Sequence, residues 1–422
     1  LYGPNTNLGH NSIIYMLESQ ARHIVRCLRE ARRREANCIE VRDDAFRRQA
    51  LTVRQRLASS IWSKCSSWYR DTSGNIPTNW PGFTFTYRWL ARHASLDAYR
   101  FARVAAIDAG RGDGSSVLAH AIPAPDSLLE RGTAAFLRGF LKLAFRSLIG
   151  PPQSARMQRF VVSLLSPLMP GCLGVTRTTQ LLNDLNVEIV KPAARRGDKV
   201  ILYLHGGAFC LGSPQSHRSI TTRLAAASHC DVWVPDYRLA PEHPHPAALD
   251  DALYCYQIML ARGHDPDHIV LAGDSAGGSL VLALTLALRD KGLRQPGKLM
   301  LISPVADLGR LTTEVVENAA IDPMLSTGWM QQAMAWYACP KDEPCHRPLE
   351  VDLSHFPPML LQVGDQEILL QDSLRLAAHA RQFGNQVTLQ VYRERWHDFH
   401  LQAALLKSSR QAIRELAAFA VS

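Results

Sequence analysis

The sequence predicts an α/β fold, with a mostly parallel sheet that carries helices on both faces. From Asn183 onward, short runs rich in β-branched and apolar residues alternate with longer segments of helical periodicity. Alternation of this kind is typical of units in which each helical crossover packs against the sheet. The runs expected to form strands are VILYLH, VWVPDY, HIVLAGD, LMLISPV, MLLQVGD and VTLQVY.

Charge divides the chain into two parts. Residues 1–150 hold 22 Lys and Arg against 12 Asp and Glu, whereas residues 151–422 hold 25 against 26. Acidic residues lie among the arginines of the first part, as in the run REARRRE at 29–35. This mixture indicates a solvated helix face, or a face that once met another domain, and we expect no nucleic-acid partner.

A membrane span and a disulfide framework are both disfavoured. The longest apolar candidate, residues 132–150, is interrupted by Arg138, Lys142 and Arg146. These residues lie four apart on one helix face. Such a helix can lie on a membrane, but packing on its own domain with the basic stripe in water is the favoured interpretation. The nine cysteines form no C-x-x-C pair, so we expect reduced thiols, no structural zinc and a cytoplasmic location.

The first half of the chain is expected to contain four helices. Apolar spacing predicts helices over 13–28, with Ser12 as the N-cap, and over 43–60. The aromatic and turn-rich residues 60–92 are expected to form loops and short strands, and residues 98–124 have the composition of a linker. Two more amphipathic helices are expected near 130–149 and 154–168.

The strongest chemical signal is the run Gly273-Asp274-Ser275-Ala276-Gly277, between a predicted strand at 268–272 and a predicted helix. G-x-S-x-G in this context forms a tight turn that exposes the serine hydroxyl at the edge of the sheet. The glycines are needed because a side chain at either position would collide with the neighbouring element. The helix N-terminus favours developing negative charge. We therefore predict that Ser275 is a nucleophile, with Asp274 in support.

A serine hydroxyl is a poor nucleophile unless a base accepts its proton. His397 follows the predicted strand VTLQVY and lies after the serine in the chain, and His400 is a competing neighbour. The acid that would orient His397 should lie beyond the strand MLLQV, where the residue types leave three candidates open. These are Asp365, Glu367 and Asp372.

Acyl transfer also requires N–H groups aimed at the developing oxyanion. The run His205-Gly206-Gly207-Ala208 follows a predicted strand, and its glycines allow backbone N–H groups to turn into the site. Ala276, directly after the nucleophile, supplies another donor. We predict an oxyanion hole of Gly206, Gly207 and Ala276, supported by His205.

Together these motifs resemble the hormone-sensitive-lipase-like branch of the α/β-hydrolases, the bacterial GDSAGG (family IV) esterases. The resemblance runs from about Pro125 to the C-terminus, and its runs are HGGAF, PDYRLAPEHPHPAALDDA, GDSAGGSL, ISPVADL and HDF. It implies the α/β-hydrolase fold, with an N-terminal helical cap over 125–180 and a catalytic domain over 181–422. It also implies that Asp236 and Tyr237 support the run His205-Gly206-Gly207-Ala208, which we call the oxyanion loop.

Two positions differ from the common pattern of this family. Ala208 stands where many members have a third glycine, which is acceptable if φ there is ordinary. The family acid lies three residues past the small residue that ends its strand, and counting from Gly364 gives Glu367, 30 residues before His397. The resemblance therefore implies that a glutamate replaces the usual aspartate, with Asp365 as the alternative acid.

Residues 1–97 are similar to the C-terminal segment of a flavin-dependent Baeyer–Villiger monooxygenase. The similarity is carried by GPNTNLGHNS at 3–12, the helix that ends near Leu28, and the runs CSSWY at 65–69 and NWPGF at 79–83. The fingerprint G-x-G-x-x-G does not occur in the sequence, so we do not expect this part alone to catalyse oxidation. The missing initiator Met leads us to expect a truncation upstream.

The sequence thus predicts a serine carboxylesterase or lactonase that acts through an acyl-enzyme on a small ester or lactone, without metal or cofactor. A fused esterase would open the ester or lactone that a Baeyer–Villiger oxidation makes. The oligomeric state stays open, a dimer included. One alternative is a non-catalytic ligand-binding α/β-hydrolase, against which the presence of His397 argues. The other is the accessory hydrolase of a truncated bifunctional monooxygenase–esterase.

Overall fold

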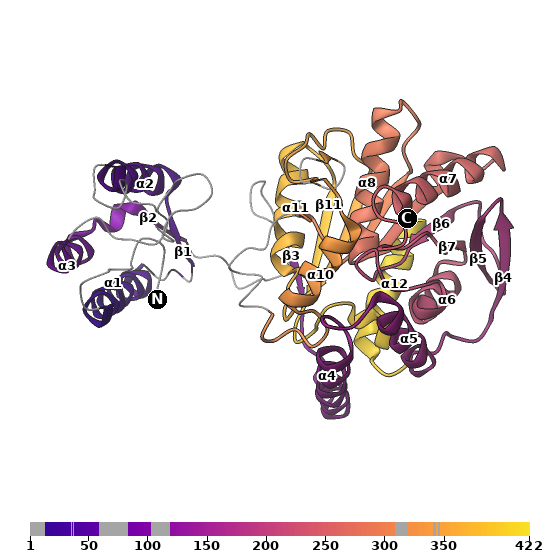
Figure 1. Ribbon diagram of the computed structural model, residues 1–422, viewed down its shortest axis with the longest axis horizontal. Coiled ribbons are helices and arrows are strands. Elements are labelled where there is room, and N and C mark those ends of the chain that lie inside the picture. The colour runs from indigo at the N-terminus through magenta and orange to yellow at the C-terminus, as the bar shows by residue number, and fades with distance from the viewer. Residues whose placement is uncertain are drawn as a thin grey trace. The chain divides into compact units, whose positions relative to one another are not determined.

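The computed structural model describes residues 13–34, 36, 38–58, 83–102, 119–308, 319–340, 343–344 and 347–422. The chain divides into two compact units, Leu1–Asp108 and Ala109–Ser422, whose elements are labelled in Figure 1. None of the helices in the described ranges is long and apolar enough to cross a membrane.

The N-terminal unit combines three helices with a small antiparallel sheet. The helices are α1 (Ile13–Arg33), α2 (Asp43–Ala58) and α3 (Thr84–His93), and the strands are β1 (Cys38–Val41) and β2 (Tyr99–Ala102). Polar contacts link α1 to α3 and β2. His23 is central to them, because its ring nitrogens lie 3.0 Å from the carbonyl oxygen of Ala91 and 2.7 Å from the hydroxyl of Tyr99.

The structure of this unit differs from expectation at two places. Helix α3 lies where loops and short strands were expected, because Phe85, Trp89 and His93 recur at the four-residue spacing of a helix face. Strand β2 lies inside the expected linker, 98–124, and pairs with β1. Ser12, residues 3–12 and residues 65–69 lie outside the described residues, as do residues 79–82 of the last similar run.

Nine strands form one sheet in the C-terminal unit, in the order β3-β11-β10-β9-β8-β6-β7-β5-β4. Pairing is parallel except for β4–β5 and β5–β7. The strands are β3 (Ala119–Ile122), β4 (Val175–Leu182), β5 (Leu185–Pro192), β6 (Val200–Leu204), β7 (Asp231–Pro235), β8 (Ile269–Asp274), β9 (Lys298–Ile302), β10 (Met359–Gly364) and β11 (Val387–Tyr392).

Strands β6 to β11 are the six runs predicted from the sequence, whereas β3, β4 and β5 were not expected. Strands β3 and β4 lie at the two edges of the sheet, where fewer side chains are buried. Strand β4 reads VTRTTQLL and is mostly exposed, so its sequence lacks the apolar pattern of a central strand.

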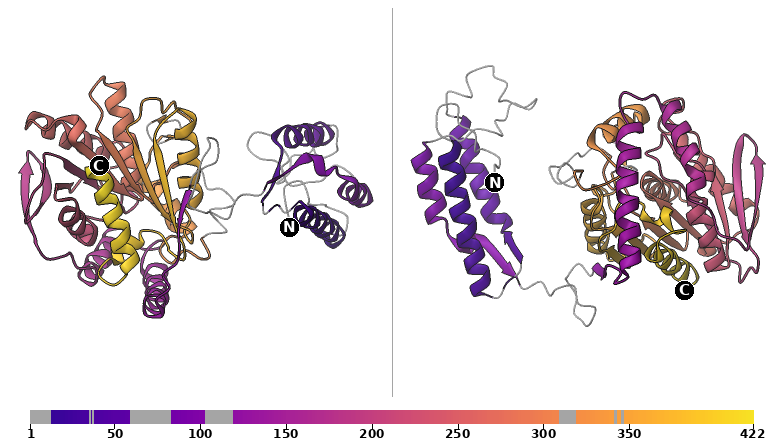
Figure 2. Two further views of the ribbon diagram at one scale, coloured as in Figure 1. Left: turned by 180° about the vertical axis from the view of Figure 1, so that it is seen from behind. Right: turned by 90° about the horizontal axis from the view of Figure 1, so that it is seen from below.

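The two faces of the sheet carry separate hydrophobic cores. Along β6, Val200, Leu202 and Leu204 face one core, and Ile201 and Tyr203 face the other, as the two-residue period of a strand requires. The first core packs against α7 (Ala247–Ala261), α8 (Ala276–Asp290) and α11 (Leu370–Gln382). The second packs against α6 (Arg218–Ser228) and α12 (Lys407–Val421), and Figure 2 shows α12 lying across this face.

Two helices lie between β3 and β4 in the segment expected to form the cap, α4 (Leu128–Leu148) and α5 (Ala155–Leu165). Each begins at a serine N-cap, Ser127 or Ser154, whose hydroxyl accepts a backbone N–H of the first turn. The expected boundaries do not coincide with elements of the sheet. Strand β3 lies within the expected linker and joins the sheet, and β4 begins inside the expected cap, 125–180.

Helix α4 packs on its own domain, as expected, but its basic stripe lies only partly in water: Lys142 and Arg146 are exposed, whereas Arg138 is half-buried. Arg138 donates to the carbonyl of Glu394 at 3.2 Å, and its guanidinium lies 5.4 Å from the ring centroid of Trp396. Arg146 donates to the carbonyls of Ala319 and Asp322. The stripe therefore attaches α4 to loops that adjoin the site.

Candidate active site

Ser275 occupies the turn between β8 and α8, with φ 53° and ψ −120°. Residues other than glycine rarely adopt such a conformation. The two flanking glycines make the turn possible, because a Cβ on Gly277 would lie 2.0 Å from the carbonyl oxygen of Leu204 and one on Gly273 would lie 2.5 Å from the backbone of Gly277. The N–H of Ser275 donates to the carbonyl of Ile302 at 2.8 Å, which helps to hold the turn.

Ser275, His397 and Glu367 lie in a continuous contact chain. Nε2 of His397 is 3.0 Å from Oγ of Ser275, and Nδ1 is 3.4 Å from Oε1 of Glu367. The second distance is slightly longer than the typical range of about 2.6–3.2 Å for such pairs. The order serine, histidine and carboxylate is that of a nucleophile, its base and the acid that orients the base.

Glu367 is fully buried just past the end of β10, and its other oxygen is fixed by the protein. Oε2 accepts a hydrogen bond from the hydroxyl of Ser303 at 2.9 Å and from the N–H of Gly364 at 2.8 Å. These bonds anchor one oxygen of the carboxylate and leave Oε1 facing His397.

The other candidate acids have different partners. Asp365 is directed toward Arg393, with 3.9 Å between Oδ2 and Nη1, and no hydrogen bond of the described residues joins it to His397. Asp372 accepts from the N–H of Ala306 at 3.0 Å and from Arg375.

His400, the competing base, is buried with Nε2 2.9 Å from Oε1 of Gln362. Burial lowers its pKa to about 3. It is therefore a neutral residue of the core, bonded to a neighbouring amide rather than to the serine.

Asp274, directly before Ser275, collects three hydrogen-bond donors. It accepts from the hydroxyl of Tyr203 at 2.6 Å and from the N–H of Gly206 at 3.0 Å, and lies 3.1 Å from Nε2 of His217. Burial raises the pKa of Asp274, but His217 and Tyr203 outweigh that effect and hold the pKa at about 2. The carboxylate is thus ionised and ties the nucleophile turn to the oxyanion loop.

His205 and Tyr237 pack against each other and support the oxyanion loop. Their rings stack with centroids 4.2 Å apart, and the hydroxyl of Tyr237 donates to the carbonyl of His205 at 2.6 Å. Burial lowers the pKa of His205 to about 3, so the ring is neutral. Asp236 does not share this role, because its side chain is exposed and its N–H donates to the carbonyl of Asn186.

The oxyanion loop differs from the sequence prediction in two respects. The N–H of Gly206 is already donated to Asp274, so it is not available to an oxyanion. Ala208 has φ 53°, so the condition under which an alanine was acceptable there, an ordinary φ, is not met. Within the described chain, no hydrogen-bond acceptor is assigned to the N–H of Gly207 or Ala208.

Asp398 contacts the proposed base from the side opposite Glu367, and sequence reasoning missed it. Its Oδ2 lies 3.0 Å from Nε2 of His397. Burial raises the pKa of Asp398 to about 6, although His397 counteracts the effect. Burial lowers the pKa of His397, but the carboxylates of Asp398 and Glu367 outweigh it and hold that pKa well above its ordinary value. The adjacency of Asp398 to the base was the only sequence signal for it.

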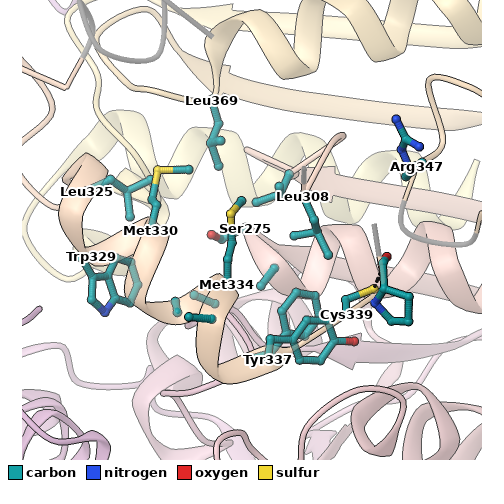
Figure 3. Close-up of a pocket in the computed structure, with 17 residues that line it drawn as sticks. Ser275, Leu308, Leu325, Trp329, Met330, Met334, Tyr337, Cys339, Arg347 and Leu369 are labelled. Atoms are coloured by element: carbon teal, nitrogen blue, oxygen red, sulfur yellow. Dashed lines mark hydrogen bonds between the residues drawn. The ribbon is translucent and has the colours of Figure 1, made fainter. Parts of the chain in front are cut away.

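Two pockets meet at Ser275. The larger pocket has a volume of about 300 Å³ and is mostly apolar; Figure 3 shows Ser275 in its middle, between Leu325, Met330, Leu308 and Leu369. Much of its wall comes from α10 (Thr327–Tyr337). The second, which we call the cap-side pocket, has a volume of about 80 Å³ and is lined by Phe145, Val162, Leu165 and Met169 together with His217, His397 and Asp398. Among the residues that the structure describes, no group of three or more His, Cys, Asp and Glu could hold a metal ion.

Comparison with known proteins gives the family. Residues 201–401 match the model of the α/β-hydrolase fold family. The chain is 38% identical to an acetyl-hydrolase of Streptomyces hygroscopicus over 234 residues, which are 55% of this chain and 78% of that protein. It is 38% identical to an esterase of Acinetobacter venetianus over 227 residues, 53% of this chain and 75% of that protein.

Solved structures agree with the curated relatives. An esterase of the bacterial hormone-sensitive lipase family superposes with a TM-score of 0.66 at 31% identity, over 71% of this chain and 99% of that one. The esterase EstE5, from a crystal soaked with p-nitrophenyl butyrate, superposes with a TM-score of 0.64 at 31% identity. The match covers 68% of this chain and 97% of that one. The chain belongs to the α/β-hydrolase fold family, in its hormone-sensitive-lipase-like branch, and is a carboxylic ester hydrolase.

Proposed function

We propose that the protein hydrolyses small-acyl carboxylic esters or lactones through an acyl-enzyme formed on Ser275. The observation that carries this proposal is the contact chain from Ser275 through His397 to Glu367, at 3.0 and 3.4 Å. His397 accepts the serine proton as Oγ attacks the carbonyl carbon, and returns it to the leaving oxygen. Water then attacks the acyl-enzyme by the same route and releases the carboxylic acid.

The oxyanion is bound by the N–H groups of Gly207, Ala208 and Ala276 in this proposal. Gly206 is replaced by Ala208 because its own N–H is held by Asp274. Ala276 stands at the first position of α8, where a helix leaves its N–H groups without an intrahelical partner. Such preorganised donors are typically worth several kcal/mol in acyl transfer.

The two pockets suit the two halves of an ester. Ser275 lies in both walls, whereas His397 lines only the cap-side pocket. Because His397 must protonate the leaving oxygen, we assign the alcohol to the cap-side pocket and the acyl group to the larger pocket. The volumes, about 80 and 300 Å³, then favour a compact leaving group.

We also propose that the substrate arises by Baeyer–Villiger oxidation, because residues 1–97 are similar to the end of such a monooxygenase. Oxygen insertion next to a carbonyl converts a ketone into an ester or lactone, which is the bond that this hydrolase cleaves. Testing short-chain lactones beside open-chain esters of the same size would decide which form is preferred. A rate on every lactone far below that on the matched ester would remove lactones from the proposal.

Steady-state hydrolysis of p-nitrophenyl butyrate tests the core of the proposal. Wild-type protein should release p-nitrophenol, and Ser275→Ala should lose roughly a thousandfold or more of kcat, because no other nucleophile is present in the contact chain. A wild-type chain that binds the ester without turnover would favour a ligand-binding protein. Near-normal turnover in Ser275→Ala would show that another residue is the nucleophile.

A further inference from the structure

Asp398 competes with Ser275 for one nitrogen of the proposed base. Its Oδ2 lies 3.0 Å from Nε2 of His397, and Oγ of Ser275 lies 3.0 Å from the same atom. Asp398 is 5% exposed and forms part of the wall of the cap-side pocket. A proton on Nε2 can therefore be held by the carboxylate or delivered toward the serine and the leaving oxygen.

The second oxygen of this carboxylate has no hydrogen-bond donor among the residues that the structure describes. Oδ1 of Asp398 is buried and makes no hydrogen bond to any described residue. Buried polar groups are usually satisfied, and an unsatisfied one is costly. Since none of the described residues supplies a donor, water or a bound molecule can take that place.

The neighbouring polar groups in the same wall are already engaged. Ser216 Oγ lies 2.9 Å from Nδ1 of His217 and donates to the carbonyl of Ser213, and Nε2 of His217 lies 3.1 Å from Asp274. The side chains from the cap are mostly apolar there. Asp398 is thus a carboxylate in this wall with one oxygen that accepts no hydrogen bond from the described residues.

The distances from His397 and Asp398 limit where a hydrogen-bond donor on the substrate can lie. To receive its proton, the leaving oxygen must lie within hydrogen-bond reach of Nε2 of His397. It is then within two hydrogen-bond lengths, about 6 Å, of the Asp398 carboxylate. A hydroxyl on the adjacent carbon of the alcohol, about 3 Å from the leaving oxygen in a staggered conformation, can bridge that interval. A plain alkyl group would place C–H bonds against the carboxylate.

We propose that Asp398 is a specificity-determining residue that accepts a hydrogen bond from the leaving alcohol, so that the enzyme prefers monoesters of vicinal diols. This inference rests on the proposed function, because it takes Ser275 and His397 as nucleophile and base. A site built to bond a hydroxyl rejects the analogue that lacks it, since the buried acceptor stays unpaired. When the alcohol hydroxyl donates to Asp398, the carboxylate attracts the proton on Nε2 of His397 less strongly. That proton can then be transferred to the leaving oxygen.

Three butyrate esters test the inference with the wild-type chain alone. 2-Hydroxyethyl, 2-methoxyethyl and propyl butyrate share the acyl group, and the methoxy ester keeps the electron-withdrawing oxygen without a donor. At about pH 8, where the Asp398 carboxylate is ionised, kcat/KM for the hydroxyethyl ester should exceed that for either other ester roughly 10–100-fold. A ratio near one, or an equal preference for the methoxy ester, would overturn the inference.

Variants then assign the preference to Asp398. Asp398→Gly and Asp398→Asn suit the backbone there, where φ is 50°. The ratio should fall to about one in Asp398→Gly, with an intermediate value in Asp398→Asn, whose neutral amide oxygen accepts a weaker bond. Ser216→Ala is the matched control, because its hydroxyl is already engaged in the same wall and the ratio should persist.

The outcomes separate this inference from the proposed function. If wild-type protein does not hydrolyse p-nitrophenyl butyrate, whose leaving group needs no hydroxyl, the proposed function itself fails. If that ester is hydrolysed and the hydroxyethyl preference is absent, or survives in Asp398→Gly, only the inference fails. Should Asp398→Gly not fold, as judged by circular dichroism, Asp398→Asn and the wild-type comparison still decide.

Discussion

The backbone N–H of Gly206 donates a 3.0 Å hydrogen bond to Oδ1 of Asp274, the residue directly before Ser275. The bond joins the loop after β6 to the turn after β8, which are neighbouring strands of the sheet. Because Gly206 is engaged in this way, the proposed oxyanion hole uses the next N–H groups of the loop. One buried carboxylate therefore joins the proposed nucleophile to the loop of the proposed oxyanion donors.

Removing a donor from Asp274 should destabilise this arrangement. Tyr203→Phe deletes the hydroxyl that donates to Oδ1 at 2.6 Å and leaves the carboxylate with one fewer partner. Hydrogen bonds to charged groups contribute about 1.5–3 kcal/mol, so we expect a free energy of unfolding lower by roughly that amount. Chemical denaturation of the two proteins measures the difference. A stability unchanged within error would mean that the Tyr203 hydroxyl does not hold the carboxylate.

Ala208→Gly should stabilise the protein or leave its stability unchanged, with activity retained. Ala208 has φ 53°, a left-handed conformation that costs about 1–2 kcal/mol for a residue with a Cβ. Glycine relieves this strain but loses about 0.5–1 kcal/mol through the greater freedom of the unfolded chain. Thermal unfolding, with butyrate ester hydrolysis in parallel, would test this. A clear loss of stability would show that φ at this position is ordinary.

The acid of the proposed contact chain can be tested by a matched pair of amide variants. Glu367→Gln keeps the size of the side chain but removes the charge that stabilises protonated His397. We expect kcat to fall by roughly several hundredfold or more, with KM little changed. Asp365→Asn should have a clearly smaller effect, because Asp365 is directed toward Arg393. If kcat fell this far in Asp365→Asn and not in Glu367→Gln, the acid would be Asp365, two residues earlier in the chain than the one proposed.

The pH dependence of kcat/KM should report the Asp398–His397 pair. The base must be neutral to accept the serine proton, so activity is lost as pH falls through the pKa of His397. Asp398 and Glu367 both raise that pKa by stabilising the imidazolium. Asp398→Asn removes one of these charges, so the acidic limb should move to lower pH. A limb that stays in place or moves to higher pH would show that Asp398 does not influence the base.

The central sheet and the Ser275 turn could be predicted from sequence because both depend on local patterns. Buried parallel strands read as continuous apolar runs, and the glycines around Ser275 are required by contacts as close as 2.0 Å. Edge strands such as β4 lack that apolar pattern, which is why they were not expected. Helix α3 was also missed, because aromatic and turn-forming residues obscured its helical spacing.

The contacts that tune the site could not be read from the sequence. Tyr203 and His217 are 71 and 57 residues from Asp274, and only the parallel pairing of β6 and β8 and the packing of the loop brings them together. The N–H of Gly206 looked suitable for the oxyanion because a sequence motif does not say which way a backbone donor points. The basic stripe of α4 had no visible partner, since its acceptors are backbone carbonyls.

Covalent labelling tests the central claim, that Ser275 carries the acyl group, most directly. A p-nitrophenyl phosphate triester such as the diethyl ester acylates no residue but phosphorylates an activated serine and leaves a stable adduct. Peptide mass spectrometry of labelled wild-type protein should place one diethyl phosphoryl group on the peptide that contains Ser275, with loss of esterase activity in proportion to labelling. Ser275→Ala should take up no label. Labelling of a different residue, or full inactivation without an adduct on Ser275, would contradict the proposed function.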